Sequence, residues 1–146
     1  MNTVWHAVMM AALLFTTQVI GGLRGESRTD QLIADFEQDS YGEWSAEGEA
    51  FGKAPARGSL PRQMRVTGYR GEGLVNSYRG GDASTGTLTS PPFTILRKRI
   101  DFLIGGGGFP GETCMQLVVD GGGVRSATGP NTRPGGREAL RWHFWD

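Results

Sequence analysis

The stretch GEGLVNSYRGGDASTGTLTSPPF, residues 71–93, decides the fold of this chain. Its β-prone residues form two short runs, 74–78 and 86–89, which a glycine-rich polar loop separates and a double proline ends. Glycine accepts the backbone angles of tight turns, and proline cannot donate a hydrogen bond to a sheet. The stretch therefore predicts short strands at the edge of a β-sandwich, with the polar loop between them facing solvent.

The polar loop carries the side chains that a binding site for a polyhydroxylated ligand needs. Arginine donates to sugar hydroxyls, carboxylate and hydroxyl oxygens accept, and an aromatic ring packs against sugar C–H groups. The candidate residues for sugar contact here are Asn76, Tyr78, Arg79, Asp82 and Ser84. A polar loop is also ordinary in any β-sandwich, so a purely structural role stays open. No nucleophile stands beside a base in this stretch, so it predicts no catalytic site.

The rest of the chain repeats the same pattern of short β-prone runs and turn residues. The clearest signal is a hairpin, in which residues 113–119 and 124–128 flank Asp120-Gly121-Gly122-Gly123. Strands at intervals of about 8–12 residues predict an all-β sandwich or barrel. In the last run we expect Trp142 and Phe144 to face the core. The further predicted strands are residues 32–37, 44–51, 66–69, 93–96, 99–104 and 138–145.

Composition limits the classes of protein that this chain can belong to. Its 146 residues are enough for one domain, and 24 of them are glycine. That glycine content is more than double the usual share of about 7% and favours turns over long helices. The 15 basic and 15 acidic residues cancel, so the chain has no electrostatic footprint for nucleic acid or an anionic membrane surface.

The N-terminus contains an apolar run, residues 7–23, that is too short and too interrupted for a typical membrane-spanning helix. It fits the apolar core of a secretory signal peptide, with cleavage between residues 22 and 27. An uncleaved anchor is the alternative, because no basic residue precedes the run and Arg24 follows it. We therefore expect a leader helix in residues 1–26, a β-sandwich module in residues 27–146, and export of the protein.

The chain has few residues that could bind a metal ion or react as a thiol. Cys114 is the only cysteine, so no internal disulfide forms, and its apolar surroundings predict a buried side chain. With one cysteine and two histidines, a zinc site lacks ligands. Asp35, Glu37 and Asp39 alternate along the first predicted strand and could contribute to a structural calcium site, because calcium takes oxygen ligands. A solvated strand face is the alternative, and we expect no other cofactor.

Trp44 is the aromatic residue that we select for sugar contact. Tryptophan offers the largest flat ring for packing against a sugar, and Trp44 lies where a loop enters a strand. A place in the core is the equally weighted alternative.

Several runs of the sequence, in order, resemble one known module. They are ADFE (34–37), EGEAFG (47–52), residues 71–93, IDFLIGGGG (100–108), LVVDG (117–121), RPGG (133–136) and LRWHFWD (140–146). Together they are similar to a non-catalytic β-sandwich module that accompanies glycoside hydrolase family 32 enzymes, the levanases and other β-fructosidases, in secreted bacterial proteins. The resemblance implies a jelly-roll sandwich of the galactose-binding-like kind, fructan as ligand, a glycoside hydrolase catalytic domain as partner, and a secreted or periplasmic location.

The sequence departs from this family in two ways. It has no Trp-Met-Asn-Asp-Pro-type motif, which carries the nucleophile of these enzymes, and it ends at Asp146 where the family's module continues with further strands. The resemblance thus implies a truncated module, marginally stable by itself. Two alternatives to sugar binding stay open: an inactive N-terminal fragment of a fructan hydrolase, and a structural spacer.

Overall fold

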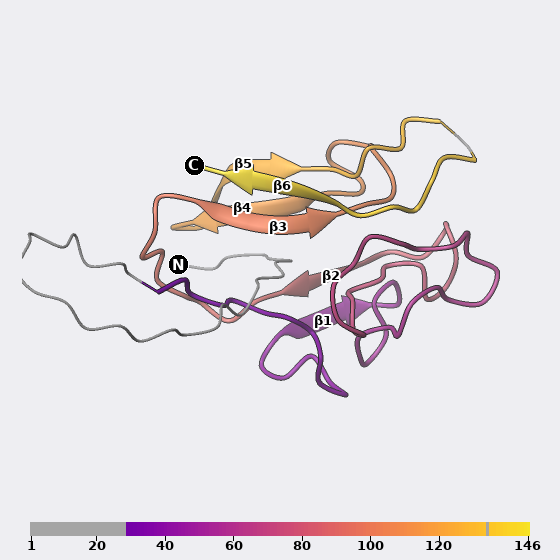
Figure 1. Cartoon of the computed structure of the whole chain (residues 1–146), viewed down its shortest axis with the longest axis horizontal. Helices are drawn as coiled ribbons and strands as arrows, with labels where there is room; N and C mark the ends of the chain where they lie inside the picture. Colours follow the sequence, from indigo (N-terminus) through magenta and orange to yellow (C-terminus); the bar gives the residue numbers. More distant parts are fainter. Residues whose placement is uncertain (1–28, 134) are drawn as a thin grey trace, which may run out of the picture.

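The computed structural model describes residues 29–133 and 135–146, and these contain six strands and no helix. All three strand pairs, β1–β2, β3–β6 and β4–β5, are antiparallel (Figure 1). The predicted all-β fold is confirmed, whereas the predicted leader, residues 1–26, lies outside the described residues. No described helix is long and apolar enough to cross a membrane. The strands are β1 (Ser45–Gly48), β2 (Gly86–Thr89), β3 (Ile100–Ile104), β4 (Met115–Val119), β5 (Gly122–Ala127) and β6 (Arg141–Trp145).

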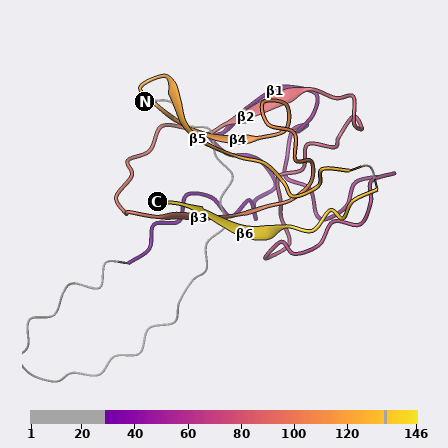
Figure 2. The same cartoon turned by 90° about the horizontal axis from the view of Figure 1, so that it is seen from above.

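The strand pairs are arranged in two layers. Figure 2 shows β3–β6 as one layer and β1–β2 with β4–β5 as the layer that faces it. The main core fills the space between β3–β6 and β4–β5 and is centred on Phe102, which is fully buried. Its other buried members are Met115, Leu117, Ala127 and Trp145. Residues from both layers thus share one apolar interior, as alternating strands with one buried face require.

The predicted β4–β5 hairpin forms, and it closes with a two-residue turn that is shorter than the predicted connection of residues 120–123. Val119 pairs with Gly122, which leaves Asp120 and Gly121 as the connection. Both have positive φ, 50° and 79°, as a type I′ turn requires. Aspartate tolerates this conformation and glycine adopts it without strain, so the local sequence alone specifies the hairpin.

The last strand forms as predicted, but with the opposite face inward. Trp145 is 7% exposed and lies in the core, whereas Trp142 and Phe144 are 48% and 47% exposed. The prediction that Trp142 and Phe144 belong to the core is therefore wrong. Side chains alternate along a strand, so only one of the two faces of β6 can meet β4–β5, and the face bearing Trp145 does.

The predicted first strand, residues 32–37, does not form. Phe36 has a φ of 60°, a left-handed conformation that interrupts extended backbone. The segment still contributes to the core, because Ile33 packs against the main cluster and Phe36 joins Tyr41 and Leu88 in a second buried cluster. The hydrophobic pattern thus identified buried residues correctly but assigned them the wrong secondary structure.

Three more predicted strands are reduced to single bridges or absent. Residues 66–69 contribute one bridge, between Thr67 and Ala139, and residues 74–78 contribute one, between Leu74 and Ala56. Residues 93–96, directly after the double proline, contain no strand. Cys114, predicted to be buried, is partly exposed.

Candidate functional site

The polar loop of residues 78–84 is a fixed structure built from turns. The Gly81 N–H donates to the Tyr78 carbonyl at 3.0 Å, and the Ser84 N–H donates to the Gly81 carbonyl at 3.1 Å. The Ser84 hydroxyl also donates to the Gly81 carbonyl, at 2.7 Å. The Arg79 N–H donates to the Ala50 carbonyl at 3.1 Å and so ties the loop to the end of β1.

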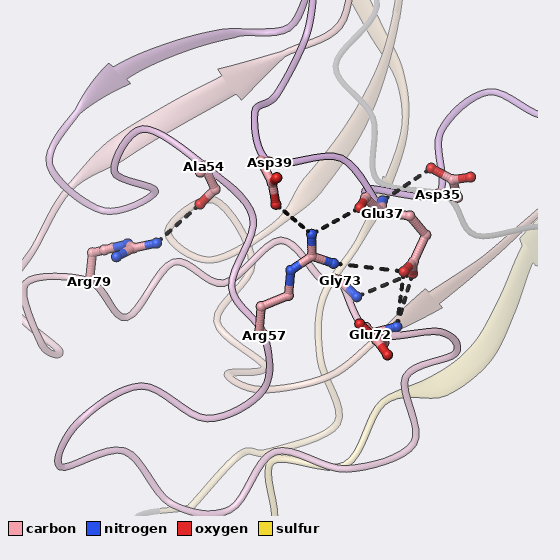
Figure 3. Close-up of polar contacts among 8 residues, drawn as sticks. All are labelled: Asp35, Glu37, Asp39, Ala54, Arg57, Glu72, Gly73 and Arg79. Atoms are coloured by element: carbon pink, nitrogen blue, oxygen red, sulfur yellow. Dashed lines mark hydrogen bonds and ion pairs between the residues drawn. The ribbon is translucent and has the colours of Figure 1, made fainter.

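Four of the predicted sugar-contact residues share this loop, but they differ in how freely they face solvent. Asp82 is exposed. Arg79 is exposed too, and its Nη2 donates to the Ala54 carbonyl at 3.2 Å (Figure 3). Tyr78 is half-buried, and its hydroxyl donates to the Arg62 carbonyl at 3.4 Å. The loop therefore presents a mixed set of donors and acceptors, with Ser84 engaged in holding the turn.

Asn76, predicted to face solvent, is 5% exposed and has a structural role. Its amide exchanges hydrogen bonds with the Gln63 amide: Asn76 Nδ2 donates to Gln63 Oε1 at 2.8 Å, and Gln63 Nε2 donates to Asn76 Oδ1 at 3.1 Å. The Tyr78 N–H donates to the same Oδ1 at 3.1 Å. A buried amide needs such hydrogen-bond partners, and these contacts hold the backbone at the start of the loop in position.

Trp44 joins the two larger core clusters and does not stand on the surface as a free platform. It is half-buried, it packs against both clusters, and its ring meets the Phe36 ring edge-on with centroids 5.1 Å apart. The cavity beside it has a volume of only about 100 Å³. This placement favours the core alternative for Trp44.

The three carboxylates proposed for calcium are held by separate contacts (Figure 3). The Glu37 carboxylate accepts the backbone N–H groups of Glu72 and Gly73, each at 3.1 Å. Asp35 Oδ1 accepts the Glu37 N–H at 3.2 Å. The Asp39 carboxylate accepts from Arg57 Nη2 at 3.0 Å.

A guanidinium group therefore lies where the prediction placed a metal ion. Arg57 Nη2 also donates to the Glu37 carbonyl at 2.9 Å, and Arg57 Nη1 lies 3.8 Å from Glu37 Oε2. Within residues 29–133 and 135–146, no three or more His, Cys, Asp or Glu side chains are grouped so as to hold a metal ion. These carboxylates do not fit a calcium site. Glu37 binds the 72–73 backbone, Asp39 binds Arg57, and Asp35 makes a local contact with the Glu37 N–H.

Tyr41 lies in the second cluster, close to the arginine of the polar loop. Burial raises the pKa of the Tyr41 hydroxyl, and the positive charge of Arg79 partly opposes this shift. The hydroxyl donates to the Phe51 carbonyl at 3.0 Å. This contact is structural, because a buried tyrosine needs an acceptor for its O–H group.

A second surface, which the sequence analysis did not select, lies on the face of β3–β6 that points away from the core. We call it the outer β3–β6 face; it consists of Asp101, Trp142 and Phe144, with Arg70 and Arg99 over the two rings. A groove of about 630 Å³ adjoins it and includes Trp142 and Asp101 in its lining. The alternation in RWHFW already places Trp142 and Phe144 on one face, but only the fold decides that this face is outside.

Comparison with known proteins relates most of this chain to part of a longer protein. A protein named "Putative glycosyl hydrolase ecdE", from Aspergillus rugulosus, is 39% identical over 136 residues. The match covers 90% of this chain, and the chain spans only 19% of the length of that relative. The chain matches no protein-family model, and no solved structure matches it. The described chain is thus an all-β protein related to one segment of a much longer protein that is named as a glycosyl hydrolase.

Proposed function

We propose that this chain is a non-catalytic carbohydrate-binding-type module of a fructan-hydrolysing enzyme of the glycoside hydrolase family 32 kind. The observation that carries the proposal is the match of 136 residues to 19% of a protein named as a glycosyl hydrolase. A segment of that size corresponds to one module of a larger protein. The choice of fructan, the jelly-roll topology and the export of the protein rest on the sequence motifs and the apolar N-terminal run.

The arrangement of the acidic residues supports a non-catalytic role. Glycoside hydrolysis commonly uses two carboxyl groups that flank the bond to be cleaved. In the described part of the chain, Glu37 and Asp39 are bound to Arg57, and Asp101 is bound to Arg99 at 2.7 Å. In these pairs the carboxylates hold loops and strand ends together.

Such a module acts by holding its enzyme close to a polymer. A weak contact with an insoluble or repetitive polysaccharide raises the effective concentration of substrate at the linked catalytic domain. The exposed, fixed loop of residues 78–84 is a surface of this kind, because its polar groups are held in place before a sugar arrives.

The direct test is retention of the purified chain on levan and inulin, with cellulose and xylan as unrelated polymers, in affinity gel electrophoresis. Selective retardation by a fructan is the expected result, together with no release of reducing sugar. Asp82→Ala should weaken retardation, whereas Glu112→Ala, which removes another exposed carboxylate, should not. Hydrolysis of fructan by the chain itself would contradict the non-catalytic assignment.

Two alternatives give different outcomes in the same experiment. An inactive enzyme fragment or a structural spacer would show a folded protein, with β-rich circular dichroism, that no polysaccharide retards. That result would overturn the binding function.

A further inference from the structure

The outer β3–β6 face carries two aromatic rings that the structure leaves half exposed. Trp142 pairs with Leu103, and Phe144 pairs with Asp101, across the antiparallel ladder. The rings are two residues apart on β6, roughly 7 Å along the strand. Both point away from the core that Phe102 and Trp145 fill. Two large rings on one sheet face form a flat apolar strip.

Charged groups are interleaved with the rings. The Arg99 guanidinium lies 4.0 Å from the centroid of the Phe144 ring, and the Arg70 guanidinium lies 5.2 Å from that of Trp142. Arg99 Nε and Nη2 donate to Asp101 Oδ1 at 2.8 and 2.7 Å. The two guanidinium groups therefore lie over the rings, and Arg99 and Asp101 hold each other in position as a donor and an acceptor beside Phe144.

The adjoining groove extends this strip. Its volume of about 630 Å³ lies within the usual range for small-ligand sites, about 300–1,000 Å³. Ile95 and Leu96, 40% and 56% exposed, supply apolar wall, and Arg97 and Lys98 supply positive charge. Trp142 belongs to both the groove and the strip, so a ligand that covers its ring can continue into the groove.

The mixture of charged and aromatic side chains on this face favours a sugar over a protein partner as its ligand. The core of a protein–protein interface is depleted of charged residues, whereas here Asp101 and two arginines lie among the rings. A sugar unit needs this mixture, because its C–H face packs on an aromatic ring while its hydroxyls require donors and acceptors at the ring's edge. The pairing of Arg99 with Asp101 offsets one positive charge with one negative charge. Arg70, Arg97 and Lys98 add positive charge nearby. The choice of a neutral sugar follows from the fructan of the proposed function.

We propose that the outer β3–β6 face, with Trp142 at its centre, is a second surface of this module, which binds a chain of neutral sugar units in addition to any contact at the loop of residues 78–84. The inference rests on the proposed function, and it assigns the main contact to Trp142 instead of Trp44. Phe144 and the Arg99–Asp101 pair bind one side of the ligand, and the groove receives the units beyond Trp142. Binding should improve with ligand length, because one sugar unit cannot span both parts.

The test compares the full-length chain with its Trp142→Ala, Trp142→Phe and Phe144→Ala variants in affinity electrophoresis on levan and inulin. Trp142→Ala should weaken retardation at least tenfold, Phe144→Ala should weaken it less, and Trp142→Phe should retain part of it. The matched control is Val124→Ala, which truncates an apolar side chain of β5 that is 46% exposed. It should change retardation less than twofold. Circular dichroism and thermal melting establish that each variant is folded.

Two results would overturn the inference, and they differ in what they say about the function. Wild-type binding to a fructan with an unchanged Trp142→Ala variant would place the sugar elsewhere and leave the proposed function intact. A folded wild-type chain that no polysaccharide retards would overturn both proposals. Sedimentation would then show whether Trp142 holds two copies together: a dimer that becomes monomeric in Trp142→Ala would identify the face as a protein interface.

Discussion

At the scale of single residues, the Glu37 carboxylate makes more long-range contacts than the carboxylates of its neighbours Asp35 and Asp39. Its carboxylate accepts backbone N–H groups of Glu72 and Gly73, some 35 residues away in the chain, and its own carbonyl accepts from Arg57. Asp39 has a fully exposed side chain, 101% on the same scale that gives 33% for Glu37. Both carboxylates contact the same arginine, so they can be compared directly.

We expect Glu37→Gln to lower the free energy of unfolding by about 1–2 kcal/mol, because charge-assisted hydrogen bonds to backbone N–H groups are lost. Asp39→Asn should change it by less than about 0.5 kcal/mol, as for other exposed ion pairs. Urea denaturation of both variants measures the difference. Equal effects would mean that Arg57, and not the two backbone N–H groups, is the important partner of Glu37.

At the scale of elements, the glycine run after β3 is a docked segment. Residues 105–108 are four consecutive glycines, a composition that is typical of a flexible loop. In the structure the Gly108 N–H donates to the Asn131 carbonyl at 2.6 Å, the Asn131 N–H donates to the Gly106 carbonyl at 3.0 Å, and the Gly129 N–H donates to the Gly107 carbonyl at 3.1 Å. Gly129 also packs directly against this run, because a Cβ there would overlap the Gly106 carbonyl.

Gly129→Ala should therefore destabilise the chain by about 1–3 kcal/mol, the usual cost of overpacking. Its Cβ would lie 2.5 Å from the Gly105 carbonyl oxygen and overlap the Gly106 carbonyl. Gly123→Ala is the matched control, because its Cβ would meet only the Gln116 side chain, at 3.9 Å. The midpoints of urea denaturation give the comparison. An undisturbed midpoint in Gly129→Ala would show that the two segments separate at little cost.

At the scale of the whole molecule, the stability of the chain depends on which face of β3–β6 is inside. The two layers meet through Phe102 and Trp145. On the opposite face of the same strand pair Leu103 is buried, whereas Trp142 and Phe144 remain about half exposed. This arrangement separates the two candidate surfaces: the polar loop of residues 78–84 precedes β2, whereas Trp142 and Phe144 belong to β6, which lies in the other layer (Figure 2).

Truncation of two phenylalanines tests this arrangement. Phe102→Ala should lower the free energy of unfolding by about 3–5 kcal/mol, because it empties the centre of the core. Phe144→Ala should lower it by less than about 1 kcal/mol, the value of an exposed cation–π contact. Thermal melting of both variants, monitored by circular dichroism, measures the two losses of stability. A larger loss in Phe144→Ala would invert the assignment of the faces.

The sequence by itself determined the fold class of this protein and its clearest hairpin. Its glycine content and short β-prone runs specify an all-β chain, and Asp120-Gly121 specifies a hairpin, because positive φ is a property of the residues in the turn. The sequence motifs also indicated the link to glycoside hydrolases, which the relative named as a glycosyl hydrolase supports at that general level.

Only the tertiary structure decided which of these residues are available for function. Alternation places Trp142 and Phe144 together but cannot say which face of β6 meets the other layer, since that depends on residues far away in the chain. The amide of Asn76 and the carboxylate of Glu37 looked available in sequence, yet their partners, Gln63 and the 72–73 backbone, come from other segments. Long-range pairing satisfies buried polar groups and selects the buried face, and no local pattern contains that information.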